Sequence, residues 1–149
     1  MLSIALTLHL LASVVWVGGM FFAHMALRPV AAEQLEPPQR LPLLYGVLGR
    51  FFPWVWLSVI LILVTGFWIL LVPFGNQAAL HVYLMMGIGL VMAGIFMFIY
   101  FFPFQRMGFA LSSGELPVAG ASMALIRRLI GVNLILGLVV TVVAAFKPF

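Results

Sequence analysis

The 149-residue sequence contains no cysteine and very few charged residues. Without cysteine the chain can form no disulfide and offers no thiolate for metal binding or nucleophilic catalysis. Only 7% of its residues are charged, against about 25% in typical globular domains. Hydrophobic residues make up 66% of the chain and its mean hydropathy is +1.29. This composition excludes an ordinary soluble domain and indicates an integral membrane protein.

The sequence also lacks the motifs of several enzyme classes. It contains no glycine-rich phosphate loop, no nucleophile elbow and no HExxH helix, and its acidic residues, Glu33, Glu36 and Glu115, fall outside the apolar runs. The net charge of +4 comes from seven Lys and Arg residues, so the high pI reflects a few flanking residues and no basic surface. Hydrolysis, phosphoryl transfer and nucleic-acid binding are therefore not expected.

Four long apolar runs dominate what is present. They cover about 2–27, 52–72, 79–103 and 126–146. Each exceeds the roughly 20 residues that cross a bilayer core, and none shows the alternating polarity of barrel strands. The first run lacks a positive n-region and a cleavage site, so we expect it to be retained. The pattern predicts an all-α integral membrane protein, a single antiparallel four-transmembrane-helix bundle over residues 1–149. Polar loops are expected at 28–50 and 104–125, and the first of them has room for a short interfacial helix.

The Lys and Arg residues predict the orientation of this bundle. Six of them lie on the side of the first and third connections, and only Lys147 lies on the side of the N-terminus, the second connection and the C-terminus. The positive-inside rule then places both termini outside and the two longer connections in the cytoplasm.

Small and polar residues predict how the helices contact one another. Small residues recur at heptad spacing at Ala5, Ala12, Gly19 and Ala26, at Ser58 and Thr65, and at Gly87 and Gly94. In lipid such seams allow helix backbones to approach closely. Asn133 is the lone polar side chain in the middle of the fourth run. We expect it to form a hydrogen bond between helices.

Two histidines are candidates for chemistry. His9 lies about seven residues into the first run, roughly 10 Å below its outer end, and His81 lies near the start of the third run on the same side. An ionisable side chain within a span usually faces the bundle interior and has a partner there. The two imidazoles are therefore expected to meet in the outer half of the bundle. The alternative is that His81 is hydrated at the interface while His9 bonds a serine or a carbonyl.

Two cofactors suit neutral imidazoles inside a helix bundle. A b-type haem takes axial nitrogens from facing helices, which would make His9 and His81 its ligands. Copper also suits imidazole, and Cu(I) suits the thioether of methionine. His81, Met85 and Met92 share one face of the third helix. Simple packing is the alternative role of the methionines.

The cytoplasmic side offers further polar residues. His24 lies fifteen residues after His9, roughly 22 Å along the helix, so the two cannot share a metal. It either binds a second cofactor, or contacts acidic groups together with Arg28, or is simply solvated. Three arginines could pair with haem propionates or lipid phosphates, although the orientation already explains them. These are Arg50, Arg127 and Arg128.

Several short motifs resemble the copper resistance protein D (CopD) family of bacterial inner-membrane proteins. They are Trp16, Val17, Gly18 and Gly19, then Arg28 and Pro29, then Arg50 and Phe51, then Thr65 and Gly66. Other residues are similar to the related HemJ-type protoporphyrinogen oxidases. These are Leu8 and His9, Leu80 and His81, and the closing Lys147, Pro148 and Phe149. The resemblance covers nearly the whole chain in the order of its elements.

The resemblance implies a multi-pass protein of the bacterial inner membrane, with both termini periplasmic, whose His9 faces a cofactor. The HemJ branch is associated with haem b and the oxidation of protoporphyrinogen, and the CopD branch with copper uptake or tolerance. The chain departs from the pattern at Tyr83, where those families tend to have lysine. This departure weakens the case for an enzyme and leaves His81 as the available second ligand.

Three functional hypotheses follow. The first is a b-type haem held by His9 and His81, with Trp16, Arg50 and Arg127 as further cofactor contacts, in electron transfer with a quinone or a small redox partner. The second is copper binding or transport through His9, His81, Met85 and Met92, with a role in copper tolerance. The third is a non-catalytic accessory subunit of a larger membrane complex. Every hypothesis includes the lipid bilayer as a partner and allows a homodimer.

Overall fold

The computed structural model describes residues 1–73 and 77–147. Pro148 and Phe149, which contribute to the resemblance, and the middle of the second connection lie outside the described residues. The described part is helical, with short links and no strand. Four helical segments are long and apolar enough to cross a membrane: Leu2–Gln34, Pro37–Leu71, Leu80–Ser112 and Leu116–Phe146. The predicted all-helical membrane fold is therefore confirmed.

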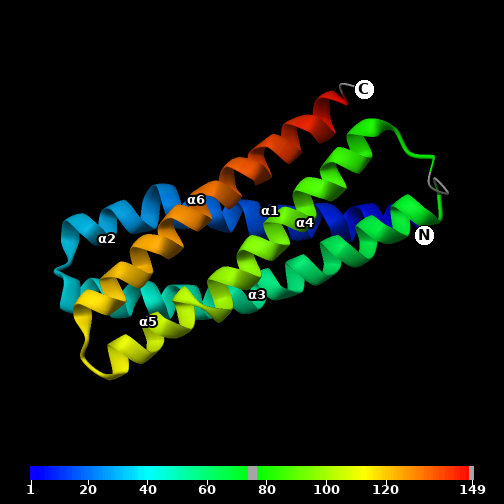
Figure 1. The fold of residues 1–149 in the computed structure, drawn as a ribbon. Coiled ribbons are helices and arrows are strands. Elements are labelled where there is room, and N and C mark those ends of the chain that lie inside the picture. Colours follow the sequence, from blue (N-terminus) through cyan, green and yellow to red (C-terminus); the bar gives the residue numbers. More distant parts are fainter. Residues whose placement is uncertain (74–76, 148–149) are drawn as a thin grey trace.

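Two of these segments are interrupted. The first segment consists of α1 (Leu2–Phe22), a π-helix η1 (Ala23–Leu27) and α2 (Arg28–Gln34), and the third consists of α4 (Leu80–Phe101) and α5 (Pro103–Ser112). The second and fourth segments are the single helices α3 (Pro37–Leu71) and α6 (Leu116–Phe146). Figure 1 shows that the chain reverses direction after each segment. One end of the molecule therefore carries the N-terminus, the end of α3, the start of α4 and the end of α6. The other carries α2, α5 and the starts of α3 and α6.

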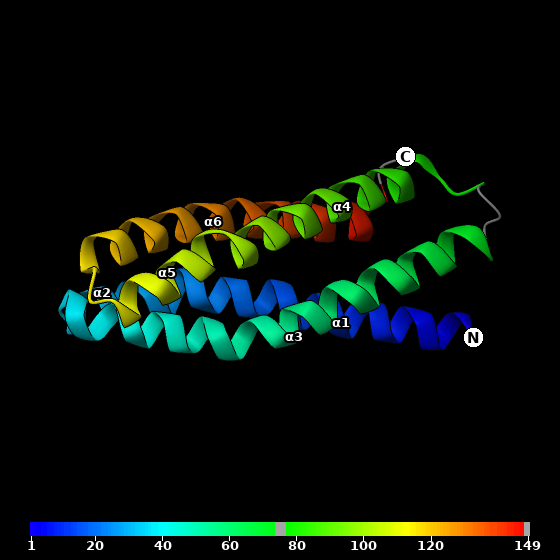
Figure 2. The same ribbon diagram turned by 60° about the horizontal axis from the view of Figure 1, so that its bottom comes forward.

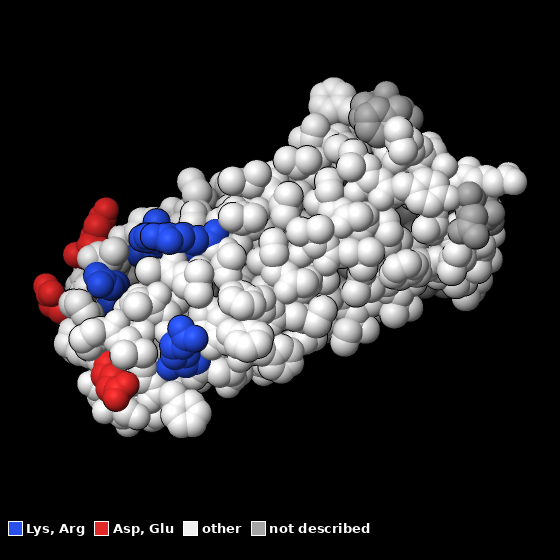
Figure 3. All heavy atoms as spheres, viewed as in Figure 1, with Lys and Arg blue, Asp and Glu red and all other residues white. Residues whose placement is uncertain are grey.

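The two ends differ in their side chains. We call the end with α2 and α5 the arginine end, because Arg28, Arg40, Arg106, Arg127 and Arg128 lie there. Figure 3 shows the basic and acidic side chains of one face gathered at this end. We call the opposite end the histidine end, because His9 of α1 and His81 of α4 lie there.

The helices extend well beyond the predicted spans at the arginine end. Residues 28–50 and 104–125, predicted as loops, are mostly helical in α2, α3, α5 and α6, so the loop prediction is wrong. Each of these helices has a proline in its first turn. Proline has no backbone N–H to lose at that position and its fixed φ suits a helix start. These prolines therefore begin helices that the polar composition had indicated as loops.

The long helices form two layers. Figure 2 shows α1 with α3 in one layer and α4 with α6 in the other. The closest packing follows the same division, because α1 packs mainly on α3, and α4 and α5 pack mainly on α6. Among the described residues, no Cα atom of α1 lies within 8 Å of a Cα atom of α4. The two histidine-bearing helices are therefore diagonal partners across the bundle.

The core lies towards the arginine end. In α4 the first buried residue is Met92, and in α6 the last is Gly137. An aromatic cluster fills the space between α3, α4 and α5: the ring of Phe52 lies 5.4 Å from that of Phe96 and 4.9 Å from that of Phe104, both edge-on. Edge-on rings at this separation attract one another beyond the area that they bury. The arginine end is thus densely packed, whereas α4 and α6 diverge from the core towards the histidine end.

The predicted seams of small residues are confirmed in part. Ala5 and Ala12 of α1 and Ser58 and Thr65 of α3 are buried. The prediction is wrong for Ala26 of η1 and for α4, where the glycines at 87 and 94 are exposed. Asn133 of α6 is 1% exposed and its Nδ2 donates to the backbone oxygen of Met92 at 3.1 Å. The predicted hydrogen bond between helices is therefore present, and it joins α4 to α6.

Candidate metal centre

His9 of α1 is held by a hydroxyl group of the neighbouring helix. Its Nδ1 lies 2.9 Å from Oγ1 of Thr65 in α3. The same Oγ1 lies 2.5 Å from the backbone oxygen of Leu61, one turn earlier. A carbonyl oxygen can only accept a hydrogen bond, so the single hydroxyl proton of Thr65 is donated to Leu61. Thr65 must then accept from His9.

This arrangement determines the tautomer of His9. Because Nδ1 donates its proton to Thr65, Nε2 of the neutral ring carries the free lone pair. A metal-binding histidine is commonly fixed in this way, with one ring nitrogen donating to an oxygen and the other bound to the metal. The α1–α3 contact therefore presents a neutral imidazole in the form that binds a metal.

Gly66 allows a methionine of α4 to approach this imidazole. A methyl group on the Cα atom of Gly66 would lie 3.4 Å from Cε1 of His9 and 3.5 Å from Cε of Met86. The imidazole of α1 and the thioether side chain of α4 thus lie side by side over the same backbone position of α3. Since α1 and α4 are diagonal partners, Gly66 is the point at which their long side chains can meet.

The methionines predicted from helical spacing lie elsewhere. Met92 is 3% exposed, and its Cε would lie 3.3 Å from a methyl group at Gly137 of α6. Met85 is half-buried on the helix face that Met92 shares, and His81 is half-buried in the first turn of α4. The spacing from His81 favours Met85 and gives no sign of Met86. Only the rotation of α4 about its axis shows that Met86 is the methionine beside His9.

The other predicted cofactor contacts do not gather around His9. Trp16 is 2% exposed and packs in the core with Met20. Arg50 is exposed on α3, and Arg127 is exposed on α6, where it borders a cavity at the arginine end. Among the described residues, no three His, Asp or Glu side chains form a cluster that could hold a metal ion. Imidazole and thioether side chains are the candidate ligands at the histidine end.

Comparison with known proteins assigns the chain to a family. The family model described as Copper resistance protein D, CopD, matches residues 45–147, well over half of the chain. The protein belongs to the CopD family. The resemblance to this family is thus confirmed, whereas no match supports the HemJ branch. No curated protein and no solved structure matches.

The matched region places the CopD-family features on the helices. It begins within α3 and ends just after α6, so it includes Thr65, Gly66 and Met86. It leaves out α1, which supplies His9. The candidate centre therefore combines three residues from the matched region with one residue that precedes it.

The described cavities of this CopD-family protein give no support for a haem site. Two described cavities have volumes of about 20 and 10 Å³, and neither is lined by His9 or His81. Each has room for about one water molecule, whereas pockets that bind small-molecule ligands and cofactors measure about 300–1,000 Å³. The second cavity lies beside Trp16 and Asn133 in the closed core. The haem prediction is unsupported, and the copper alternative fits the family better.

Proposed function

We propose that this CopD-family protein binds Cu(I) at the histidine end and carries it across the membrane as cargo. The observation that supports the proposal is that the imidazole of His9, whose Nε2 has the free lone pair, and the side chain of Met86 both lie against Gly66. Imidazole and thioether are ligands that Cu(I) accepts in proteins. The proposal agrees with a family whose description is copper resistance.

The charge distribution favours a soft monovalent ion over a hard divalent one. All three carboxylates of the chain, those of Glu33, Glu36 and Glu115, lie at the arginine end. Mg²⁺ and Ca²⁺ require oxygen ligands, usually including carboxylates. Neutral nitrogen and sulfur ligands instead do not cancel the charge of the ion. A bound Cu(I) ion then brings only one positive charge into the membrane, whereas a divalent ion would bring two. The histidine end therefore discriminates by ligand type.

Further ligands along α4 would extend the site. We assign His81 and Met85 as donors near the membrane surface and Met92 as a donor deeper in the bundle. The three share one face of α4, with Met92 next to Gly137. A series of weak sites is what passage requires, because each ligand set must release the ion to the next.

The orientation proposed for the bundle brings copper from outside. The arginine end, which carries six of the seven basic residues of the chain, faces the cytoplasm of a bacterial cell by the positive-inside rule. The histidine end and both termini then face the periplasm. Copper would therefore first meet His81 and His9 on the periplasmic side of the inner membrane.

Titration of the detergent-purified protein with Cu(I) against a competing chelator tests the proposal. We expect the wild type to bind Cu(I), and the affinity to be lower by roughly tenfold or more in His9→Ala and in Met86→Leu, because each loses a metal ligand. Met97→Leu is the matched control, since Met97 is 40% exposed on the same helix. Equal affinities in all four proteins would refute the assignment of the site.

An absorption spectrum of the same preparation separates the copper proposal from the haem alternative. We expect no Soret band. A Soret band that shifts on reduction with dithionite and is lost in His9→Ala would overturn the copper proposal in favour of haem-linked electron transfer. Stoichiometric recovery of another membrane protein, without Cu(I) binding, would instead favour an accessory subunit.

A further inference from the structure

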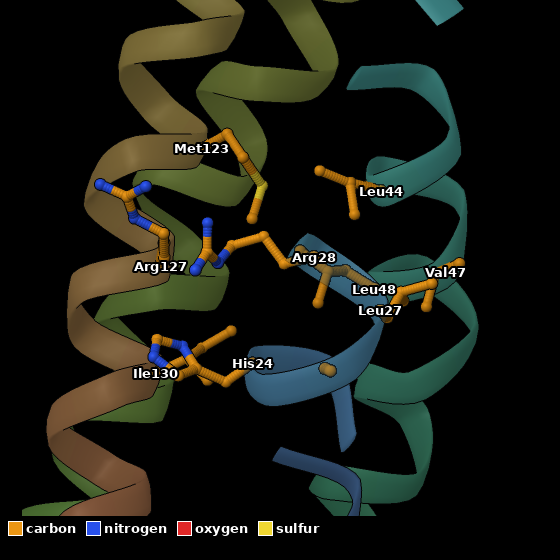
Figure 4. Close-up of a pocket in the computed structure, with 10 residues that line it drawn as sticks. His24, Leu27, Arg28, Leu44, Val47, Leu48, Met123, Arg127 and Ile130 are labelled. Atoms are coloured by element: carbon orange, nitrogen blue, oxygen red, sulfur yellow. The ribbon is translucent and has the colours of Figure 1, made fainter. Parts of the chain in front are cut away.

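A cavity at the arginine end gathers three cationic or basic side chains. Its polar lining comes from His24 of η1, Arg28 of α2 and Arg127 of α6, and the rest of the lining is apolar. Figure 4 shows the guanidinium of Arg28 reaching from its helix towards α6, with Arg127 on one side and His24 on the other. The three side chains therefore come from two segments that are far apart in the sequence.

The backbone of both segments provides space for the side chain of His24. His24 lies within the π-helix Ala23–Leu27, and π-helical turns inside α-helices occur frequently at functional sites. On the facing helix, a methyl group at Gly131 would lie 3.2 Å from Cε1 of His24. Any side chain larger than glycine at this position would press on the imidazole. The π-helical turn and Gly131 thus make room for His24 between the helices.

Arg28 leaves one hydrogen-bond donor unused. Its Nε atom is buried and has no hydrogen-bond partner among the described residues. A buried donor of a charged group without a partner costs about 1–3 kcal/mol or more. An acceptor from outside the chain would remove this cost.

We propose that the cavity binds a phosphate group through Arg28 and Arg127, with His24 as an additional donor. Two guanidinium groups repel a metal cation, so the site is distinct from the copper site. Guanidinium groups match phosphate oxygens with paired, charge-assisted hydrogen bonds. The cavity volume of about 20 Å³ admits one oxygen atom, comparable to a water molecule. The rest of the phosphate then lies at the mouth, beside the exposed Arg127.

A phospholipid headgroup and free phosphate share this chemistry. The test therefore uses the purified full-length protein in a non-ionic detergent with three probes, which are dioctanoyl phosphatidylglycerol, dioctanoylglycerol and inorganic phosphate. Binding is measured by isothermal titration. We expect phosphatidylglycerol to bind and dioctanoylglycerol, which lacks the phosphate, not to bind. Binding of inorganic phosphate would identify the free ion as sufficient, and its failure would identify the lipid as the source.

Three variants test which arginines are responsible. We expect Arg28→Gln and Arg127→Gln each to weaken binding roughly tenfold, because a hydrogen bond to a charged group contributes about 1.5–3 kcal/mol. Arg128→Gln is the matched control: Arg128 is exposed, follows Arg127 in the same turn of α6 and does not line the cavity. Its loss removes the same net charge, and we expect a change of at most about twofold.

Two outcomes would overturn the proposal. The first is that neither phosphate-bearing probe binds. The second is that Arg128→Gln weakens binding as much as Arg127→Gln, which would show general attraction to a basic surface. If Arg28→Gln does not fold, Arg127→Gln still decides, because an exposed arginine can be replaced without disturbing the core. Cu(I) binding is expected to be unchanged in all three variants, so a failure here is distinct from a failure of the copper proposal.

Discussion

The two ends of the molecule use the same apolar composition in different ways. At the arginine end α3, α4, α5 and α6 enclose a cluster of aromatic rings, and side chains such as Ile99 and Met107 are 1% exposed or less. At the histidine end neither α4 before Met92 nor α6 after Gly137 contributes a buried residue. One end of the bundle is thus densely packed, whereas the helix faces at the other end are open.

This difference indicates that the two ends of the bundle have different roles. The regions of a protein that bind and release ligands are drawn from its less stable parts. Here the proposed copper ligands lie at the open end, where side chains such as Met86 can move without disturbing the core. The packed end holds the helices together and fixes the angle at which they diverge. The following predictions compare matched changes at the two ends.

The largest expected effect is on stability at the arginine end. Phe52→Ala removes a ring that is 2% exposed and contacts three other clustered rings. We expect the free energy of unfolding to fall by about 2 kcal/mol or more, chiefly from the cavity left behind, since lipid already solvates an apolar ring. Phe146→Ala at the histidine end, where the ring is 78% exposed, is expected to change it little. Unfolding in mixed micelles, followed by near-ultraviolet circular dichroism, measures both.

Equal losses in these two variants would contradict the comparison. They would show that Phe146 is covered in the membrane and that the histidine end is packed as closely as the arginine end.

The next effect concerns the affinity for Cu(I). Thr65→Val removes the hydroxyl oxygen that accepts from Nδ1 of His9 and so releases the tautomer of the ring. We expect the Cu(I) affinity to fall about tenfold, the lower range for losing a group that orients a metal ligand. Thr141→Val is the matched control, because Thr141 donates to a backbone oxygen one turn earlier in the same manner. An unchanged affinity in Thr65→Val would show that the threonine does not orient a metal ligand.

The sequence predicted the helical fold because long apolar runs leave few alternatives in a bilayer. It also predicted the hydrogen bond of Asn133 between helices, since a lone polar side chain in a span needs a partner. Helix lengths at the arginine end were not predictable from polarity. Prolines at helix starts and polar helix formers have the composition of loops, and only packing of α5 on α6 distinguishes the two.

The rotation of α4 was the part of the candidate site that spacing could not give. In a helix of a soluble protein the apolar stripe faces the core. A membrane helix is apolar all round, so the residues that face lipid have the same composition as those that face other helices. Spacing from His81 therefore favoured Met85, and only the structure placed Met86 over Gly66. The predicted seam of glycines in α4 was wrong for the same reason, because a small residue can face lipid as easily as a neighbouring helix. Likewise, no residue pattern marks the π-helix around His24.

The smallest expected effects come from two glycine substitutions of opposite sign. A methyl group at Gly137 would lie 2.9 Å from Cγ2 of Val17 and 3.3 Å from Cε of Met92. Gly137→Ala is therefore expected to lower the free energy of unfolding by about 1 kcal/mol, the lower range for overpacking. A methyl group at Gly87 meets nothing within 4 Å, so Gly87→Ala is expected to raise it by up to about 1 kcal/mol through helix propensity. Because the two substitutions add the same group to the same kind of helix, the helix propensity cancels and the difference between the two changes measures the local packing. A loss at Gly87 would mean that the open face of α4 is covered by another protein surface in the membrane.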